Sequence, residues 1–343
     1  MMCASRRLRV LCLAAIALFM CTWQGSGDQD TVTVVTWNIE HLGSRGRGLG
    51  GIGAASLPGR TDAQLEAIAA LLRDDLKADI VALQEVGVSA VTVSGAQSEA
   101  LEKIRQALGD DWRCRVAMPA GETPEPGDVH NLHTAFVWNS ATVDLLKAFE
   151  LQFPNETVGA KRLFDRLPLV GYFEAVKDGA GTNDFVLTCV HLASGQDKWQ
   201  NHLAACIIIE QNLPRALKFH EVKEQERVIL GDFNDNPYAV DDNGDIKYSD
   251  LLPRYMRARR YNDLVRRADG FTRMNSARSS IIDHVFRHTY LRADIMGDDA
   301  HVYHPADMTD PGLAQWRLTY SDHFPVYFDI KVDTKDRDKD WGQ

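Results

Sequence analysis

The sequence predicts an α/β protein with a sheet that is partly antiparallel. Short β-branched runs alternate with segments of helical periodicity along most of the chain, and this alternation is typical of α/β folds. The runs between residues 134 and 190 follow one another too closely for crossover helices, so their strands are expected to pair antiparallel. Polar residues close several of the runs, which places a candidate site at the carboxyl ends of the strands.

The expected elements follow in chain order from these periodicities. Expected strands cover residues 32–37, 80–84, 134–138, 170–176, 185–190, 227–230, 281–286 and 325–332. Expected helices cover residues 62–76, 98–108 and 202–213, the first of them with Leu65, Ile68, Ala69 and Leu72 on one face. Glycine-rich or polar stretches at 43–59, 119–130 and 241–245 are expected to be loops.

The first 27 residues form a separate unit. Three arginines at positions 6, 7 and 9 precede an apolar run from Val10 to Met20, and small residues follow at positions 25–27. This order is typical of a secretory signal peptide, and the apolar run is short for a membrane span. We therefore expect residues 1–27 to be a signal peptide, residues 28–343 to be the mature domain, and the protein to be secreted or periplasmic. A retained membrane anchor is the weaker interpretation.

The charge of the chain argues against a general affinity for polyanions. Removing three arginines and no acids from a formal net charge of −10 leaves −13 on the mature protein, so nucleic acid receives no overall attraction. Arginines do cluster at positions 254, 257, 259, 260, 266 and 267. This cluster fits a solvated helix face as well as a phosphate-binding patch. Nucleic acid as substrate is therefore neither required nor excluded.

Cysteine usage excludes a disulfide scaffold. Only Cys114, Cys189 and Cys206 remain outside the signal peptide, and there is no C-x-x-C pair. At most one disulfide can form within the chain, and a zinc or redox motif is unsupported. With 45% hydrophobic residues, the mature chain is instead expected to depend on a large apolar core.

Polar groups recur at the ends of six expected strands. They are Trp37-Asn38-Ile39-Glu40, Gln84-Glu85, His191, Gly231-Asp232-Phe233-Asn234, Asp283-His284 and Ser321-Asp322-His323. Carboxylates and amides without thiolates suit a hard divalent cation, and Mg²⁺ takes one or two carboxylates and fills its other positions with water and phosphate oxygens. The pattern therefore predicts a site for Mg²⁺, or for Mn²⁺ or Ca²⁺, that binds a phosphoester.

The six motifs together resemble a known family. WNIE, LQEV, VHL, GDFND, IDHVF and SDHFPV are similar to the motifs of the endonuclease/exonuclease/phosphatase superfamily, which has the DNase I-like fold. The resemblance runs from about residue 32 to residue 331. It implies a four-layer α/β/β/α sandwich of two mixed, largely antiparallel sheets, and a metal-dependent phosphodiesterase that cleaves by in-line attack of an activated water.

The resemblance also implies metal ligands. Glu85 resembles the principal metal-binding glutamate of the superfamily, and Asp322 is expected to be a further ligand. Glu40 occupies the place where the abasic-site endonucleases of the superfamily carry an acidic neighbour of the metal. Asn38 resembles the asparagine that positions the phosphate or a metal-bound water.

The remaining site residues are implied in the same way. Asp232 resembles the residue that activates the attacking water, and Asn234 the residue that orients it. His323 is expected to stabilise the transition state, with Asp283 fixing its tautomer. His191 and Arg166 are expected to contact the phosphate.

The substrate stays open at this stage. Leu132 and His133 occupy the place where DNase-type members carry a Glu-Arg pair, which weakens the case for double-stranded DNA. A nuclease is the first interpretation, a sphingomyelinase-like or inositol-phosphate phosphatase is the alternative, and a catalytically idle binding module is a third. A monomer without a stable membrane partner is expected. His41, His202 and His220 are expected to lie in loops or on helix surfaces, and His284 on the face of its strand opposite to Asp283.

Overall fold

The structure is a computed structural model that describes most of residues 31–332. The described residues are 31–43, 46–47, 57–92, 95–118, 132–152, 157–158, 161–164, 166–177, 180–195, 198–239, 249–265, 270–274, 280–292, 294–297 and 299–332. The predicted signal peptide and most of the three predicted loops lie outside these residues. Within them, no helix has the length and apolar character needed to cross a membrane.

Two mixed sheets form the centre of the molecule. The first has eight strands in the order β17 (His301–Val302), β18 (Val326–Lys331), β1 (Thr31–Leu42), β4 (Ile80–Gly87), β8 (Leu132–Asn139), β7 (Trp112–Val116), β6 (Gly95–Gln97) and β5 (Ala90–Thr92). The second has six, in the order β15 (Tyr261–Asp263), β16 (Asp283–His288), β14 (Arg227–Asp232), β13 (Ala180–His191), β12 (Leu169–Lys177) and β9 (Val143–Glu150). Two short pairs, β2 (Gly46–Arg47) with β3 (Leu57–Pro58) and β10 (Thr157–Val158) with β11 (Lys161–Arg162), stand apart.

One parallel strand pair in each sheet sets the position of the candidate site. Among the described strands, β1 with β4 and β13 with β14 are the parallel pairs, and the other pairings are antiparallel. Parallel neighbours end at the same edge of a sheet. The register therefore brings Asn38 beside Gln84 in the first sheet and His191 beside Asp232 in the second.

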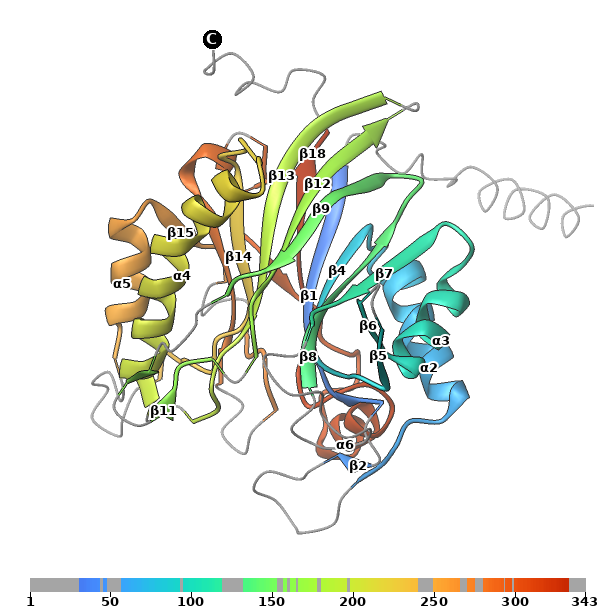
Figure 1. The fold of residues 1–343 in the computed structure, drawn as a ribbon. Helices are drawn as coiled ribbons and strands as arrows, with labels where there is room; N and C mark the ends of the chain where they lie inside the picture. Colours follow the sequence, from blue (N-terminus) through green and yellow to red (C-terminus); the bar gives the residue numbers. More distant parts are fainter. Residues whose placement is uncertain are drawn as a thin grey trace, which may run out of the picture.

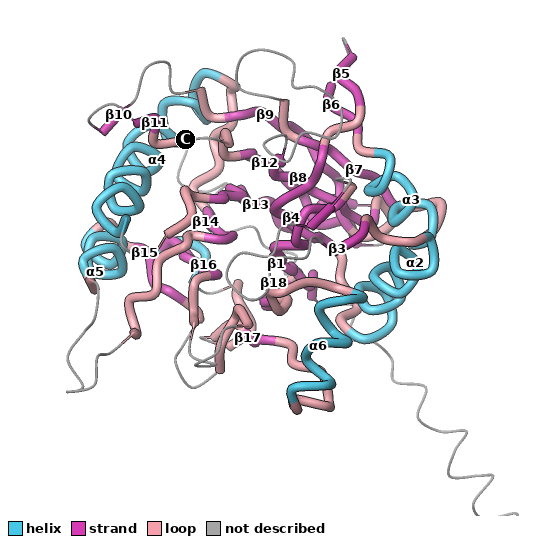
Figure 2. The backbone as a smooth tube through the Cα atoms, turned by 90° about the horizontal axis from the view of Figure 1, so that it is seen from below, coloured by secondary structure: helices cyan, strands magenta, loops and turns pink. Residues whose placement is uncertain are grey.

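Helices cover the outer face of each sheet. Figures 1 and 2 show α2 (Asp62–Ala70) and α3 (Glu99–Leu108) beside the first sheet, and α4 (Trp199–Phe219) and α5 (Leu251–Ala258) beside the second. A π-helical turn, Leu71–Asp75, extends α2. The side chains of Thr61 and Ser98 cap the amino ends of α2 and α3, which satisfies backbone donors that a helix leaves unpaired. The result is the predicted four-layer α/β/β/α sandwich.

The core between the sheets explains why the two layers stay together. Phe136 of β8 packs edge-on against Phe173 of β12, with ring centroids 5.2 Å apart, and both rings are fully buried. Phe185 of β13 continues this cluster. Burying a side chain of this size contributes roughly 1.5–3 kcal/mol, so the aromatic contacts join the sheets firmly. Two further apolar clusters lie outside the sheets. One packs the first sheet against α2 and α3, and the other packs the second sheet against α4 and α5.

Every expected strand and helix is present, although several run longer than expected. Helix α4 extends to Phe219 through Pro214, and β16 begins at Asp283 rather than at residue 281. Four sizeable elements were not expected from the periodicity: β7, β9, α5 and α6 (Asp310–Thr319). The sequence VDLLKAFE of the edge strand β9 mixes exposed apolar and charged residues, which hides its alternation. The cysteines at 114, 189 and 206 are free thiols.

Candidate active site

The candidate site lies where the carboxyl ends of β1, β4, β13 and β14 meet the start of β16 and the segment before β18. Asn38 of β1 is the residue that joins the two sheets. Its Nδ2 atom donates to Oε1 of Glu85 at 3.1 Å and to Oδ2 of Asp232 at 2.9 Å. The first acceptor belongs to the same sheet and the second to the other, so one amide group sets the separation of two carboxylates.

The backbone around Asn38 and Glu85 is unusual. The ladder between β1 and β4 is interrupted between Asn38 and Leu42, and Glu40, His41 and Glu85 have positive φ angles of 45°, 54° and 63°. Left-handed backbone is costly for residues other than glycine, and it clusters at functional sites. This conformation allows the backbone N–H of His41 to donate to Oε2 of Glu85 at 3.0 Å.

Glycine is required at the end of β14. Gly231 has φ 138°, and a Cβ atom there would lie 2.1 Å from the carbonyl oxygen of Val190. This close approach of the β13 and β14 backbones places Nε2 of His191 3.6 Å from Oδ2 of Asp232 and 3.8 Å from Oε1 of Glu85. Burial, with the charges of Arg166 and His323 next, holds the pKa of His191 well below its usual range, so this imidazole is neutral at pH 7.

The hydrogen bonds and the raised pKa of Asp232 suit a general base. Its Oδ1 atom accepts from the backbone N–H of Asn234 at 2.8 Å, and its Oδ2 atom accepts from Asn38. Burial and the nearby carboxylate of Asp283 raise the pKa of Asp232 to about 6. A carboxylate with this pKa is ionised at neutral pH and still accepts a proton readily.

Asn234 lies two residues after Asp232 and hydrogen-bonds to the neighbouring loop. Its side-chain Nδ2 donates to the carbonyl oxygen of Leu192 at 3.0 Å, and its φ of 51° is again left-handed. The amide oxygen of Asn234 is thereby oriented away from Leu192. Sequence reasoning assigned Asn234 to orientation of water, and its place beside Asp232 suits that role.

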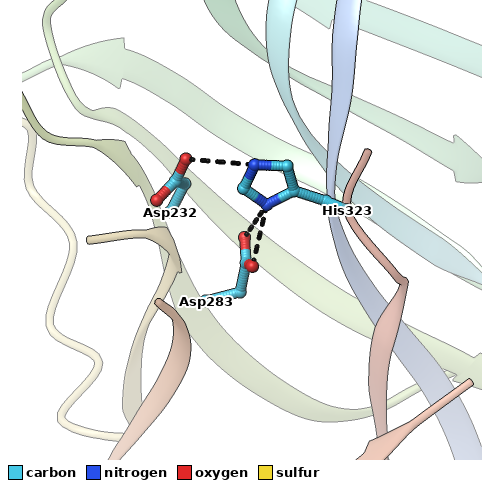
Figure 3. A group of neighbouring side chains, drawn as sticks. All are labelled: Asp232, Asp283 and His323. Carbon is cyan, nitrogen blue, oxygen red and sulfur yellow. Dashed lines mark hydrogen bonds and ion pairs between the residues drawn. The ribbon is translucent and has the colours of Figure 1, made fainter. Parts of the chain in front are cut away.

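His323 lies between two aspartates from the other sheet (Figure 3). Its Nδ1 donates to the carboxylate of Asp283 at 2.9 and 3.1 Å, and its Nε2 lies 3.9 Å from Oδ2 of Asp232. Burial acts to lower the pKa of His323, but the carboxylates of Asp283, Asp322 and Asp232 outweigh burial and raise that pKa to about 10. The imidazole is therefore a buried cation, pointing at the same space as Glu85, Asp232 and His191.

The two other acids predicted as metal ligands are engaged by arginines. The carboxylate of Glu40 accepts from Nη2 of Arg317 at 2.6 Å and from its Nε at 3.1 Å. Oδ2 of Asp322 accepts from Nε of Arg273 at 3.2 Å, and Nη2 of Arg317 lies 3.9 Å from it. Burial acts to raise the pKa of Asp322, but His323, Arg273 and Arg317 lower it. The Asp322 carboxylate is thus ionised, and an arginine lies at hydrogen-bond distance from each of the two acids.

The donor set at Glu85 fits a hard divalent cation. The side chain of Glu85 is 17% exposed, whereas that of Asp232 is 2% exposed, so Glu85 is the more accessible carboxylate. Ligand atoms of Asp232, Asp283 and His323 lie within 4.8 Å of one another, but Nδ1 of His323 is occupied by its hydrogen bonds to Asp283. Carboxylates with few nitrogen donors suit Mg²⁺ or Mn²⁺, and Glu85, the more accessible of the two, is the carboxylate that would hold such an ion, with Asp232 joined to it through Asn38.

Arg166 lies at the edge of the same space. Its Nε donates to the carbonyl oxygen of Leu132 at 3.0 Å. Burial and the charge of Arg166 lower the pKa of His133 to about 4, and Arg166 contributes to the low pKa of His191 as well. Its charge therefore acts on both His133 and His191, the second of which faces the candidate site.

Sequence reasoning missed three site residues and misjudged another. His41, expected in a loop, has Nε2 3.4 Å from Oε2 of Glu85; it follows WNIE directly, and this proximity was the available signal. Arg273 and Arg317 had no signal, because their segments carry no motif. His202 was expected on a helix surface, which is wrong: it is 1% exposed, because α4 turns this residue toward the loop after β14.

The structure also places His284, His220 and part of the arginine cluster. His284 points away from His323, as predicted, and its Nδ1 is 2.8 Å from Oδ2 of Asp263. His220 is half-buried and stacks on Phe149 at 3.9 Å between ring centroids. In the arginine cluster, Arg254 pairs with Asp250 and Arg259 with Glu210, as on a solvated helix face, while residues 266 and 267 lie outside the described residues.

Comparisons with known proteins agree with this architecture. The sequence profile described as the Endonuclease/Exonuclease/phosphatase family matches residues 35–323, and no curated protein matches the chain. Among solved structures, an endonuclease/exonuclease/phosphatase family protein from Bacteroides thetaiotaomicron is similar, with 16% identity, coverage of 88% of this chain and 98% of that one, and a TM-score of 0.55.

Two structures from animals share the fold at comparable distance. The catalytic domain of human Nocturnin with bound sulfate has 14% identity, covers 87% of this chain with 93% of its own length, and gives a TM-score of 0.55. TDP2 from D. rerio, complexed with a single-strand DNA product, has 12% identity, coverage of 87% and 98%, and a TM-score of 0.51. The profile match spans most of the chain and all six motifs begin or end within it, so the protein belongs to the endonuclease/exonuclease/phosphatase family.

Proposed function

We propose that this protein is an exported, divalent-metal-dependent phosphodiesterase, and that its substrate is nucleic acid. The family includes phosphodiesterases, nucleases and phosphatases, and its enzymes generally depend on a divalent metal. The observation that carries the proposal is the array from Asp283 through His323 to Asp232 and Asn38. It presents a buried base and a buried cation to one space, and the Asn38 amide holds the base in place.

Asp232 takes the proton of the attacking water. Its pKa of about 6 leaves it ionised at pH 7, and the backbone N–H of Asn234 and Nδ2 of Asn38 hold its two oxygens in place. The new bond forms between the water oxygen and phosphorus, while the bond from phosphorus to the leaving oxygen breaks on the opposite side. Asn234 lies beside Asp232 and orients the water.

His323 stabilises the charge that gathers on the phosphate oxygens. Preorganised donors and cations in a dry site are worth several kcal/mol to such a transition state, and the imidazolium is held by Asp283 without reorganisation. His191 donates from Nε2 as a neutral imidazole, and Arg166 offers its guanidinium from the same side of the site. A divalent ion at Glu85 would supply electrophilic polarisation of a phosphate oxygen and charge for the leaving oxygen.

Nucleic acid is the substrate that the site residues favour. Arg166 lies close to His191, while Arg273 and Arg317 pair with Asp322 and Glu40, and these positive charges favour a phosphodiester anion at the site. The export of the protein is proposed from residues 1–27. Sequencing the amino terminus of the protein recovered outside the cytoplasm tests that part: a terminus near residue 28 supports export, and an intact terminus contradicts it.

An activity panel tests the enzymatic proposal. The purified mature protein would be incubated with Mg²⁺, Mn²⁺ or Ca²⁺ and with single-stranded, plasmid and abasic DNA, RNA, sphingomyelin and phosphoinositides. EDTA and the Asp232→Asn variant serve as controls, since a real activity disappears with both. Metal-dependent cleavage of DNA or RNA supports the proposal. Cleavage confined to the lipids assigns a phospholipid substrate instead, and a protein that cleaves none of them is a binding module.

A further inference from the structure

A second group of buried polar side chains lies behind the candidate site, outside the mechanism described above. His202 of α4 and Asp235, in the loop after β14, each have a side chain that is 1% exposed. The Nδ1 atom of His202 lies 3.7 Å from Oδ1 of Asp235. Among the described residues, neither this nitrogen nor either carboxylate oxygen of Asp235 has a hydrogen-bond partner. A buried ionised carboxylate without a donor is costly by several kcal/mol.

A direct hydrogen bond between the two groups requires a proton between them. Nε2 of His202 lies 2.8 Å from the carbonyl oxygen of Ala193. Because a carbonyl only accepts, Nε2 carries a hydrogen. A neutral imidazole would then direct the lone pair of Nδ1 at the carboxylate, which also only accepts. A proton on either Nδ1 or the carboxyl group turns this repulsive contact into a hydrogen bond after a small closure of the gap.

The pair lies where the two catalytic loops touch. The loop after β13 follows His191, and the loop after β14 contains Asp232 and Asn234. Three hydrogen bonds join these loops or anchor them: Leu192 N–H to the carbonyl of Asp232 at 2.9 Å, Asn234 Nδ2 to the carbonyl of Leu192 at 3.0 Å, and His202 Nε2 to the carbonyl of Ala193 at 2.8 Å. Asp235 follows Asn234 directly, so His202 contacts both loops from α4.

Asp235 is supported on its other side as well. Nε2 of His284 donates to the backbone carbonyl of Asp235 at 2.9 Å, and Nδ1 of His284 donates to Asp263 at 2.8 Å. Burial acts to lower the pKa of His284, but Asp263 raises it to about 9. The backbone of Asp235 is thus held by a charged histidine of β16, while its side chain faces His202.

We propose that His202 and Asp235 are positioning residues that share one buried proton and hold the loops of His191 and Asn234 in register. Its kinetic consequence rests on the proposed hydrolase function. The structural consequence, which is the order of the two loops, does not depend on that function. The Asp235→Asn variant is the informative change, because the amide N–H₂ can donate to Nδ1 of a neutral His202 and so replaces the shared proton. Asp235→Ala and His202→Leu remove the contact altogether.

The structural test uses nuclear magnetic resonance on the mature protein without substrate. In the wild type we expect either a His202 with both ring nitrogens protonated or an Asp235 carboxyl carbon with the shift of a carboxylic acid. In Asp235→Asn we expect a neutral His202 with hydrogen on Nε2 alone. We also expect the amide hydrogens of Leu192 and Asn234 to exchange at least tenfold faster in Asp235→Ala and His202→Leu. A neutral His202 beside an ionised Asp235 overturns the proposal.

The kinetic test uses the substrate that the activity panel identifies. Asp235→Ala and His202→Leu are expected to lower kcat by about 10- to 100-fold, as for other residues that orient a catalytic group, with a smaller change in KM. Asp235→Asn is expected to stay within about threefold of the wild type. Leu213→Ala, a core truncation in the same helix, is the matched control for lost stability and should keep its kcat. Equal losses in Leu213→Ala, or unchanged kcat in Asp235→Ala and His202→Leu, overturn the proposal. The resonance test remains decisive if the panel finds no substrate.

Discussion

The two sides of the candidate site each contribute a buried histidine, and one imidazole is a cation while the other is neutral. His323, before β18, is 2% exposed, and His191, at the end of β13, is 6% exposed. The pKa of His323 is raised to about 10, whereas the pKa of His191 is held well below its usual range. Burial opposes the charged form in both cases. The difference must therefore come from what each ring touches.

Hydrogen-bonded carboxylates account for the difference. Nδ1 of His323 donates to Asp283, and two more carboxylates lie within 4 Å of its Nε2. Among the described residues, Nδ1 of His191 has no hydrogen-bond partner, and arginines 166 and 273 act against its protonation. A carboxylate at hydrogen-bond distance thus decides whether a buried histidine is charged. The carboxylates of Glu85 and Asp232, at 3.8 and 3.6 Å from Nε2 of His191, do not keep that ring protonated beside two guanidinium groups. One side of the pocket supplies a cation and the other a neutral donor.

Removing the two imidazoles separately should give unequal losses. His323→Ala is expected to lower kcat by about a thousandfold, since it deletes a preorganised cation from the transition state. His191→Ala is expected to cost roughly tenfold less, because a neutral donor contributes less than a charged one. Steady-state kinetics on the substrate found by the panel measures both. Equal losses would mean that the charge of His323 has no catalytic value.

The matched control for this comparison is His288→Gln. His288 is also buried and belongs to β16, but burial and the charges of Arg227 and Arg260 lower its pKa to about 4, so it is a neutral core histidine. Its replacement should change stability without changing kcat. A large loss of activity in this variant would show that any buried histidine of the fold has the same effect.

Asp283→Asn should make His323 more like His191. The amide is nearly isosteric but carries no charge, so the pKa of His323 is expected to fall from about 10 toward its ordinary value. We expect kcat to decrease by roughly a hundredfold at neutral pH, the size typical of losing the group that orients a catalytic side chain. Titration of the imidazole by nuclear magnetic resonance checks the cause. A His323 pKa that stays near 10 would assign the shift to Asp322 instead.

The pH dependence of the reaction should show both site groups. Asp232 must be ionised to accept a proton, so kcat/KM is expected to fall about tenfold per pH unit below its pKa of about 6. His323 must stay charged, so activity is expected to fall above about pH 10. Rate measurements from pH 4 to 11 with saturating metal check this profile. In Asp283→Asn the alkaline limb should move to lower pH, and the acid limb should also move to lower pH, because the Asp283 carboxylate helps to raise the pKa of Asp232.

Much of the fold and part of the site could be predicted from the sequence, for physical reasons. Strands β4 and β13 contain the buried, largely apolar runs IVAL and FVLTCV, and GDFN ends β14 next to a glycine whose Cβ would strike Val190. Such local constraints leave visible patterns. The place of Arg273 and Arg317 in the site was not predictable, because it depends on ion pairs with Asp322 and Glu40, which lie in separate segments of the chain. The burial of His202 depends likewise on Asp235, a contact made only in three dimensions.

Arg166 gives the smallest and most diagnostic change on the His191 side. Arg166→Met removes one of the positive charges that keep His191 neutral, so the pKa of His191 should rise. Burial is the larger cause of its low value, and the rise should therefore leave His191 mostly neutral at pH 7. The loss of a guanidinium contact to the phosphate should raise KM about tenfold with kcat nearly unchanged. If kcat falls instead while KM is constant, Arg166 acts on the transition state. Residues on both sides of the site would then stabilise the charge of the transition state.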